Sequence, residues 1–408
     1  MPFGKSFKVF HRSGRPMIPV NLWKRNRARP VRPGKGLRVE ELRDHPTHPD
    51  PTLSIVVVNY RGWPDVARLV AELVDSPALA SGNSELIVVD NGSGEAIPRS
   101  MIAPTIGLRL ILLDENNGFS AGVNVGYRAS AGRWILILNP DVVAGPGLIE
   151  RTMRRIDAYE SRTEGTPGVV GFELRNPDGS RQPSIGVFPG LARTLREQVI
   201  PRTRRKYQPE RKVRPGPVDW ATGACLLLNR RMLDELGGMD EDFFLYHEEV
   251  ALCHSATLRG WGVEFDPEVS VVHLHPLQNR PISPKMRPVI RHGKLLYFRK
   301  HRPAWEFEAL ALAVRAEAGF RGVLAKARGR SRESRSWKAV DRVAALLVSG
   351  VKLGGRAVRI LADSVDDLAE EPERPGPCER RKSLGRGPSW THGRPERIRP
   401  TSPRKDGP

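Results

Sequence analysis

Four short apolar runs, each ending at a polar residue, divide the first part of the chain. Near-continuous runs of branched aliphatic residues are typical of strands that are buried on both faces of a parallel sheet. They cover residues 53–58, 85–90, 108–113 and 134–138. Between them, apolar residues recur at helical spacing from Pro64 to about residue 74, and the segment 116–122 leads into a helix that is expected to reach about residue 131.

This alternation predicts an α/β fold, with a mostly parallel, Rossmann-like sheet flanked by helices. In such sheets the carboxyl ends of the strands meet at one edge, and ligands bind there. The polar residues at these ends are Asn59, Asp90, Asn117 and Asp141. They predict a nucleotide-type site, whereas the absence of a GxGxxG motif after the first strand disfavours a dinucleotide-binding fold.

The run at 134–138 stops abruptly at Asn139-Pro140-Asp141. Proline lacks an N–H group and cannot continue a central ladder, so the chain leaves the sheet there. Asn139 and Asp141 are two residues apart and, on an extended backbone, could together hold a metal ion or a phosphate-bound metal. A strand-ending turn without further function explains the same tripeptide.

The middle of the chain continues the alternation. Strands are expected at 169–174, 182–188, 218–228, 262–266 and 270–273, and helices at 146–159, 232–237 and 249–259. The strand at 218–228 has small residues at its centre, where Gly223 would allow a ligand or another backbone to approach closely. Glu248 and Glu249 open the last of these helices, where acidic side chains also suit a purely structural role at a helix N-terminus.

Beyond Pro303 the pattern becomes helical, with helices expected at 305–326 and 337–361. The second helix combines apolar and basic residues, so it either lies in an anionic membrane interface or packs against the main domain. Residues 1–50 and 366–408 are rich in Arg and Pro and are expected to be a disordered basic arm and tail. The expected organisation is therefore an α/β domain at 51–300 and a helical extension at 301–365.

Composition narrows the classes further. The net charge of +20 suggests an anionic partner, but much of the arginine lies in the terminal thirds, and no zinc-finger spacing or RNP-like segment supports nucleic-acid binding. The three cysteines form no CxxC pair, which fits a reducing compartment. No stretch is long and apolar enough for a spanning helix or a signal peptide. The expected location is cytoplasmic, peripheral at the inner face of the cell membrane.

Seven motifs, in this order, resemble glycosyltransferase family 2, and within it the rhamnosyltransferase-like branch. They are IVVVNY, VVDNGS, NNGFSAGVN, LNPDV, DWATGAC, GGMDEDFFLY and VVH. The resemblance covers about residues 52–300. It implies a GT-A fold and a metal-dependent inverting glycosyltransferase of cell-envelope polysaccharide biosynthesis. Such an enzyme moves a sugar, with rhamnose as the candidate, from a nucleotide-diphosphate donor to a glycan or polyprenyl-linked acceptor.

The resemblance also implies roles for individual residues. Asn59, Asp90 and Asn91 would line the nucleoside pocket, and Asn117, Gly118 and Asn124 would approach the donor. Asn139 and Asp141 stand at the family's metal motif, where Asp141 would bind Mg²⁺ or Mn²⁺ bridging the diphosphate, with His273 completing the metal shell. Trp220, Thr222 and Gly223 would lie on the acceptor side, and Glu248 and Glu249 would carry the catalytic carboxylates.

The chain departs from the family at the catalytic motif. The usual pattern after the Phe-Leu-Tyr run is Glu-Asp-x-Asp-Leu, whereas this chain has Glu248-Glu249-Val250-Ala251-Leu252. Glu249 stands where the family has the Asp that acts as the catalytic base, and its side chain is one methylene longer. Ala251 replaces a second Asp. A non-catalytic nucleotide-sugar or glycan-binding relative is therefore the alternative interpretation.

Overall fold

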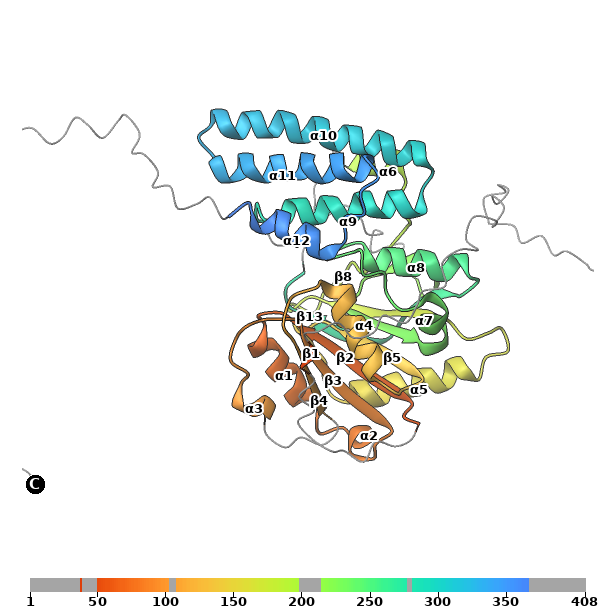
Figure 1. The fold of residues 1–408 in the computed structure, drawn as a ribbon. Coiled ribbons are helices and arrows are strands. Elements are labelled where there is room, and N and C mark those ends of the chain that lie inside the picture. Colours follow the sequence, from red (N-terminus) through yellow and green to blue (C-terminus); the bar gives the residue numbers. More distant parts are fainter. Residues whose placement is uncertain (1–36, 39–49, 103–107, 198–213, 277–280, 367–408) are drawn as a thin grey trace, which may run out of the picture. The chain divides into compact units, whose positions relative to one another are not determined.

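A computed structural model describes residues 37–38, 50–102, 108–197, 214–276 and 281–366 (Figure 1). Its main sheet follows the order β1-β4-β3-β2-β5-β12-β7-β13-β10. Strands β4 (Leu108–Leu113), β3 (Ser84–Asp90), β2 (Leu53–Asn59) and β5 (Trp134–Leu138) are parallel neighbours. The predicted four-stranded parallel core is confirmed, because each of these strands coincides with one of the apolar runs.

Beyond β5 the sheet contains an antiparallel strand. β12 (Cys225–Asn229) pairs antiparallel with both β5 and β7 (Val169–Arg175), and β7 pairs in parallel with β13 (Val263–His273). Short strands complete the sheet at its margins, namely β1 (Leu37–Arg38), β6 (Val142–Val143), β8 (Arg181–Gln182) and β10 (Gly216–Pro217). The mostly parallel sheet that the sequence predicts is therefore confirmed, with the antiparallel strand β12 between its two parallel parts.

Four expected strands have different bounds in the structure. The segment 218–228 is not one strand but β11 (Trp220–Ala221) and β12, separated at Thr222–Ala224. The segment 182–188 contains only β8 and β9 (Ile185–Gly186), and β9 pairs with β11 in a separate two-stranded sheet. Conversely, 262–266 and 270–273 join in the single strand β13, which has an irregularity between Asp266 and Ser270. Local composition cannot distinguish a bulge or a sheet change from a strand end.

Helices cover both faces of the sheet. Alternate residues of β2 face two clusters of buried apolar residues, one with α1 (Trp63–Leu73) and α5 (Leu148–Glu160), the other with α4 (Phe119–Ala129), α7 (Arg230–Leu236) and α8 (Glu248–Leu258). Short helices α2 (Pro77–Ala80), α3 (Arg99–Ile102) and α6 (Leu191–Glu197) lie in the connections. The sheet is thus buried on both sides, as its apolar strands require.

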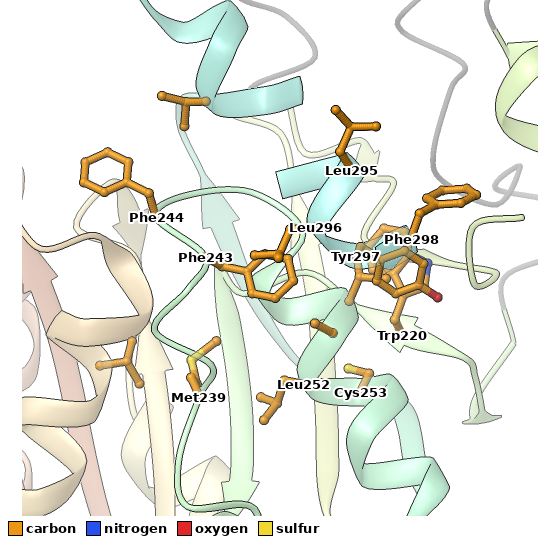
Figure 2. Packing of buried hydrophobic residues seen from close by; sticks show 14 of the residues in the cluster. Trp220, Met239, Phe243, Phe244, Leu252, Cys253, Leu295, Leu296, Tyr297 and Phe298 are labelled. Carbon is orange, nitrogen blue, oxygen red and sulfur yellow. The ribbon is translucent and has the colours of Figure 1, made fainter. Parts of the chain in front are cut away.

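The helical extension forms a further layer on the α8 side. It consists of α10 (Ala304–Ala327), α11 (Ser331–Val348) and α12 (Gly355–Asp363), together with α9 (Met286–His301), which falls almost entirely within the segment 51–300 expected as the α/β domain (Figure 1). Figure 2 shows Leu296 of α9 beside Phe243 and Tyr297 of α9 beside Trp220, and these residues belong to the same buried cluster as Leu252 and Cys253 of α8. The extension therefore shares one continuous core with the α/β part.

The prediction of a single helix at 337–361 is wrong. The segment contains two helices, α11 and α12, which are separated at 349–354. Val343 and Leu347 of α11 are buried in the common core, so the apolar face of this segment packs against the protein. Packing was one of the two alternatives that its pattern left open. Among the described residues no helix is both long and apolar enough to cross a bilayer.

The expectations for the two ends of the chain mostly lie outside the described residues. One part of the N-terminal arm differs from the expectation of disorder, because Leu37–Arg38 forms β1 at the edge of the sheet, antiparallel to β4.

Candidate active site

Asn59 and Asp90 end neighbouring parallel strands and are paired in register. Asn59 Nδ2 donates to Asp90 Oδ1 at 2.7 Å, and the hydroxyl and backbone N–H of Ser93 also donate to the Asp90 carboxylate. Asn59 Oδ1 accepts from Gly62 N–H at 3.0 Å. The predicted proximity of the two strand ends is thus present, and a buried hydrogen-bond network fixes the backbone of both loops.

Asn91 joins the second loop to the third. Its side-chain amide donates to Gly118 O at 2.8 Å and accepts from Asn117 N–H at 3.2 Å. Asn116 Oδ1 accepts from Gly118 N–H, which closes the turn before α4. Gly118 has φ +96°, and a Cβ there would lie 2.6 Å from Phe244 O, so only glycine fits.

Asn124 holds the loop that leads to the two glutamates. Its side chain donates to Met239 O and to Glu241 Oε1, each at 2.8 Å, and accepts from Met239 N–H. Lys300 of α9 contacts Asp240 and Asp242 at 2.6 and 2.5 Å. The polar atoms of Asn124 are thus engaged by this loop, which gives the side chain a positioning role.

Asp141 and His273 lie together although 132 residues of sequence separate them. β6 pairs with β13 with Val142 opposite His273, and Leu274 N–H donates to Asp141 O. The His273 Nε2 atom lies 3.4 Å from Asp141 Oδ1. On its other side, His273 Nδ1 lies 2.7 Å from Gln182 Oε1, and Gln182 Nε2 donates to His273 O and Asn176 Oδ1. Because the Gln182 carbonyl can only accept, Nδ1 carries a proton, and Nε2 is the ring nitrogen that faces Asp141.

This pair fits a divalent cation that is also bound by a substrate. A carboxylate oxygen and an imidazole nitrogen are suitable ligands for Mn²⁺, and the carboxylate also for Mg²⁺. Within the described part of the chain, no three His, Cys, Asp or Glu side chains converge on one metal-sized site. A metal held here would therefore take its remaining ligands from water and a diphosphate, as Mg²⁺ commonly does.

The turn that carries Asp141 is clamped from α1. Arg68 donates to Val142 O at 3.0 Å and to Pro140 O at 3.3 Å, and Glu72 accepts from Ala144 N–H at 2.7 Å. The neighbouring residue Asn139 donates its backbone N–H to Ala224 O. The Asn-Pro-Asp segment is thus a fixed turn at the sheet edge.

Glu248 and Glu249 begin α8 after a strained turn. Tyr246 and His247 both have left-handed backbones, with φ of 72° and 70°, which is uncommon for residues with side chains. His247 O accepts from Ala251 N–H and starts the helix. Both glutamates are buried. A Cβ on Gly223 would lie 3.9 Å from the Cβ of Glu249 and 3.7 Å from the ring of Phe119, so the Glu249 stem borders the N-terminus of α4 at Gly223.

The residues predicted for the acceptor side lie close to this helix start. Trp220 is buried and donates from its indole to Val187 O, and Thr222 N–H donates to Ser184 O. Trp220, Tyr246 and His247 line a cavity of about 260 Å³ that α9 and α10 also border. A second cavity, of about 480 Å³, lies between Asn117 and the start of α12, where Arg356 contacts Glu115 at 3.1 Å.

The structure thus brings Asn59 to Asp90, Asn91 to Asn117 and Gly118, Asp141 to His273, and Gly223 to Glu249. Sequence reasoning missed Ser93, Asn116 and Gln182. Ser93 follows Asp90 by three residues, a spacing that suits a hydrogen bond across a turn. Asn116 is the first residue of the motif NNGFSAGVN and directly precedes Asn117. Gln182 carries no local signal, because its contact is with a residue 91 positions away.

Residues 54–237 match the profile of glycosyl transferase family 2. The chain is 28 % identical over 292 residues to an N-acetylglucosaminyl-diphospho-decaprenol L-rhamnosyltransferase of Mycobacterium tuberculosis, a match that covers 67 % of this chain and 92 % of that protein. It is 24 % identical over 170 residues to rhamnosyltransferase WbbL of Escherichia coli, covering 42 % of this chain and 63 % of the relative.

Among solved structures, a mannosyltransferase of Pyrobaculum calidifontis aligns with 16 % identity and a TM-score of 0.42, covering 81 % of this chain and 92 % of the other. The family implied by the seven motifs and the family profile agree, and the mostly parallel sheet with flanking helices is the expected GT-A architecture. The chain therefore carries a glycosyl transferase family 2 domain over residues 54–237.

Proposed function

We propose that this glycosyltransferase moves a sugar, with inversion, from a nucleotide-diphosphate donor to a hydroxyl group of a saccharide acceptor. The position of Gly223 supports the proposal most directly. Gly223 lies beside both the stem of Glu249, the candidate base, and the ring of Phe119, the first residue of α4 after Asn117 and Gly118. A sugar bound next to Gly223 would be in reach of groups from both sides, and such alignment is a large part of catalysis.

The donor's nucleoside would bind at the edge formed by Asn59, Asp90 and Asn91, with its diphosphate toward Asn117, Gly118 and Asn139. Asp141 and His273 would hold Mg²⁺ or Mn²⁺, which supplies positive charge to stabilise the leaving diphosphate. Gln182 would keep His273 in the tautomer that binds a cation through Nε2. The hydrogen bonds from Arg68 to Pro140 O and Val142 O hold the backbone on both sides of Asp141.

In the transfer step, the acceptor oxygen forms a bond to the anomeric carbon on the face opposite the diphosphate. The bond between that carbon and the diphosphate oxygen breaks, and the electron pair leaves with the diphosphate. The acceptor's proton passes to a carboxylate oxygen of Glu249. One displacement of this kind inverts the configuration, so no covalent sugar–enzyme intermediate is required.

The acceptor is proposed to be a cell-envelope glycan or a polyprenyl-linked saccharide. The mycobacterial relative is named for an N-acetylglucosaminyl-diphospho-decaprenol acceptor and an L-rhamnosyl group. The cavity at Trp220, Tyr246 and His247 is the candidate acceptor pocket. Its walls are apolar at Leu310 and Val314, and its four Lys and Arg side chains outnumber its two glutamates, so a net positive charge would suit a saccharide on a lipid diphosphate. An enzyme of this kind would work at the cytoplasmic face of the membrane.

The test is a screen of nucleotide-diphosphate sugars with Mn²⁺ or Mg²⁺, with release of nucleoside diphosphate as the measurement. Release should be stimulated by a short-chain lipid-linked N-acetylglucosamine diphosphate, stopped by EDTA and restored by added metal. A product of inverted anomeric configuration is expected. Nucleotide-sugar binding without release, with every acceptor and metal, would instead make the protein a non-catalytic binding relative.

A further inference from the structure

Helix α10 is apolar on two opposite sides. Its inner side, with Phe307, Leu310, Ala311, Val314 and Ala318, is buried in the common core. On the outer side, Trp305, Leu312, Phe320 and Val323 are between 62 % and 71 % exposed. A helix that covers a protein ordinarily turns charged residues outward, so an apolar outer side marks an interaction surface.

The exposed apolar residues of α10 form one continuous line along the helix, which we term the outer stripe. Residues 305, 309, 312, 316, 320 and 323 follow each other at intervals of three or four, and those between the large side chains are Ala309 and Ala316. At 1.5 Å per residue the stripe is about 27 Å long. It contains no charged residue over this length.

Basic groups border the C-terminal half of the stripe, whereas the exposed Glu308 lies beside its N-terminal half. Arg315 lies beside the stripe and pairs with Asp341 of α11 at 2.8 Å, and α11 exposes Lys338 and Arg342 next to that pair. Lys326 and Arg328 are exposed at the end of the helix. Between residues 304 and 366 the chain has twelve Lys and Arg against seven Asp and Glu.

We infer that the outer stripe of α10 docks on an anionic lipid bilayer, with the helix parallel to the membrane plane. Apolar side chains flanked by basic groups are the pattern of helices that lie in the interface, and an aromatic ring such as that of Trp305 is favoured at that depth. The basic side chains add attraction to anionic headgroups, which falls with salt. The docking element is therefore α10 and not the segment 337–361, whose apolar face is buried.

A second copy of the chain fits this surface less well than a bilayer. A stripe about 10 Å wide and 27 Å long covers roughly 270 Å², whereas a stable interface buries about 800 Å² on each partner. Two copies would also bring together surfaces with the same net positive charge. A lipid surface has no minimum area and carries the complementary charge.

Docking through α10 would place the proposed acceptor pocket one helix away from the membrane surface. Leu310 and Val314 line that pocket from the inner side of α10, opposite the stripe. A lipid-linked acceptor could then reach the pocket while its chain stays in the bilayer. This consequence rests on the proposed function, whereas binding to lipid does not.

The experiment is sedimentation of the full chain with vesicles of phosphatidylcholine alone or containing about 30 % phosphatidylglycerol, without donor or acceptor. Wild type should bind the anionic vesicles, and added salt should weaken binding. The double variant Leu312→Ser/Phe320→Ser should lose binding at least about tenfold, because it removes the two most apolar central contacts. Lys326→Gln/Arg328→Gln should weaken binding to anionic vesicles only. Leu258→Ser is the matched control, since Leu258 is similarly exposed on α8.

Thermal unfolding would check that each variant is folded, and light scattering would give its oligomeric state. Unchanged vesicle binding by folded Leu312→Ser/Phe320→Ser would overturn the inference, as would a wild-type dimer that this variant converts to a monomer. Because the assay needs no turnover, vesicle binding by an inactive protein would leave the inference intact and contradict only the proposed function.

Discussion

Gln182 accepts a hydrogen bond from Nδ1 of His273, while Nε2 of the same imidazole faces Asp141. The glutamine belongs to the short strand β8, and the histidine ends β13, the longest strand of the described sheet. Both side chains are buried, so the imidazole has little freedom to rotate or to exchange its tautomer. This contact provides an outer partner for a candidate metal ligand, and such partners typically tune the metal.

Replacing Gln182 should weaken metal binding without removing a metal ligand. Gln182→Met keeps the size of the side chain but cannot accept from Nδ1, so Mn²⁺ affinity should fall by about 10–100-fold. Gln182→Glu retains an accepting oxygen and should preserve much of the affinity. Mn²⁺ titration in the presence of a nucleoside diphosphate, followed by electron paramagnetic resonance, measures both. Equal affinities for Gln182→Met and wild type would contradict the proposed orienting role.

Asp141 should be required for transfer but not for folding. Its carboxylate is at a turn whose backbone carbonyls accept hydrogen bonds from the Arg68 side chain and from Leu274 N–H. These hydrogen bonds do not involve the Asp141 side chain and survive its loss. Asp141→Ala should therefore unfold near the wild-type temperature, while metal-dependent release of nucleoside diphosphate is abolished. Full activity of Asp141→Ala, or wild-type activity that excess EDTA does not change, would exclude the metal assignment.

The parallel half of the fold could be predicted because its signals are local. Each of the strands β2, β3, β4 and β5 is an apolar run with a polar end, and handedness alone places those ends at one edge. This reasoning puts Asn59 near Asp90, and register pairing of β2 with β3 confirms it. The family motifs add the order of the remaining elements.

The rest depends on contacts between distant segments. Nothing in the sequence around Gln182 indicates His273, and nothing in the apolar pattern of 218–228 shows that the chain changes sheets around Gly223. Apolar spacing at 337–361 likewise cannot reveal the partner that buries Val343, although Gly350 and Gly354-Gly355 are local signals for the break at 349–354. In each case the deciding information is which surface covers the segment, and that is a property of the whole fold.

Gly293 should be needed for the conformation of the turn that precedes the glutamates. A Cβ at this position would lie well inside the van der Waals distance of Tyr246 O, and backbone cannot yield as a flexible side chain does. Gly293→Ala should cost about 1–3 kcal/mol of stability and lower kcat by displacing the start of α8. Gly319→Ala is the control, because nothing lies within 4 Å of a Cβ there and alanine favours the helix. Equal kcat for both variants would rule out coupling between α9 and the glutamates.

Three histidines, the buried His292 and the partly buried His254 and His301, should make the fold sensitive to mild acid. Burial lowers the pKa of His254 to about 4, of His292 to about 4 and of His301 to about 3, all below the ordinary value of 6.5. Below pH 6.5 the unfolded chain therefore binds protons that the folded chain does not, and the stability that is present at higher pH is lost as pH falls toward 4. Each histidine contributes a slope of up to about 1.4 kcal/mol per pH unit.

Urea unfolding at pH 7.5, 6 and 5 measures this loss of stability. His292→Gln can still donate to Leu353 O, as His292 Nε2 does at 2.7 Å, and should give a shallower dependence on pH. Identical slopes for this variant and wild type would show that His292 does not contribute.

Glu249 should be the residue that accepts the acceptor's proton. Glu248 and Glu249 are consecutive in the first turn of α8, so their side chains point about 100° apart and cannot both face one hydroxyl. Gly223 lies beside the stem of Glu249 and next to Phe119, the first residue of α4. Glu249→Gln keeps the size and hydrogen-bonding capacity of the side chain but removes its basicity. Its kcat should fall by about 10²–10⁴-fold, while donor binding survives, because general-base catalysis typically contributes that much.

Two further variants separate the glutamates from each other. Glu249→Asp restores the residue that the family usually has there and should retain activity or raise it, since the carboxylate is kept and only its reach changes. Glu248→Gln should cost less than Glu249→Gln if Glu248 mainly stabilises the start of α8. Steady-state measurement of kcat, together with calorimetric measurement of donor binding, distinguishes a loss of catalysis from a loss of binding. If Glu248→Gln is inactive and Glu249→Gln is nearly normal, Glu248 is the base. If both variants transfer sugar normally, neither carboxylate is the base.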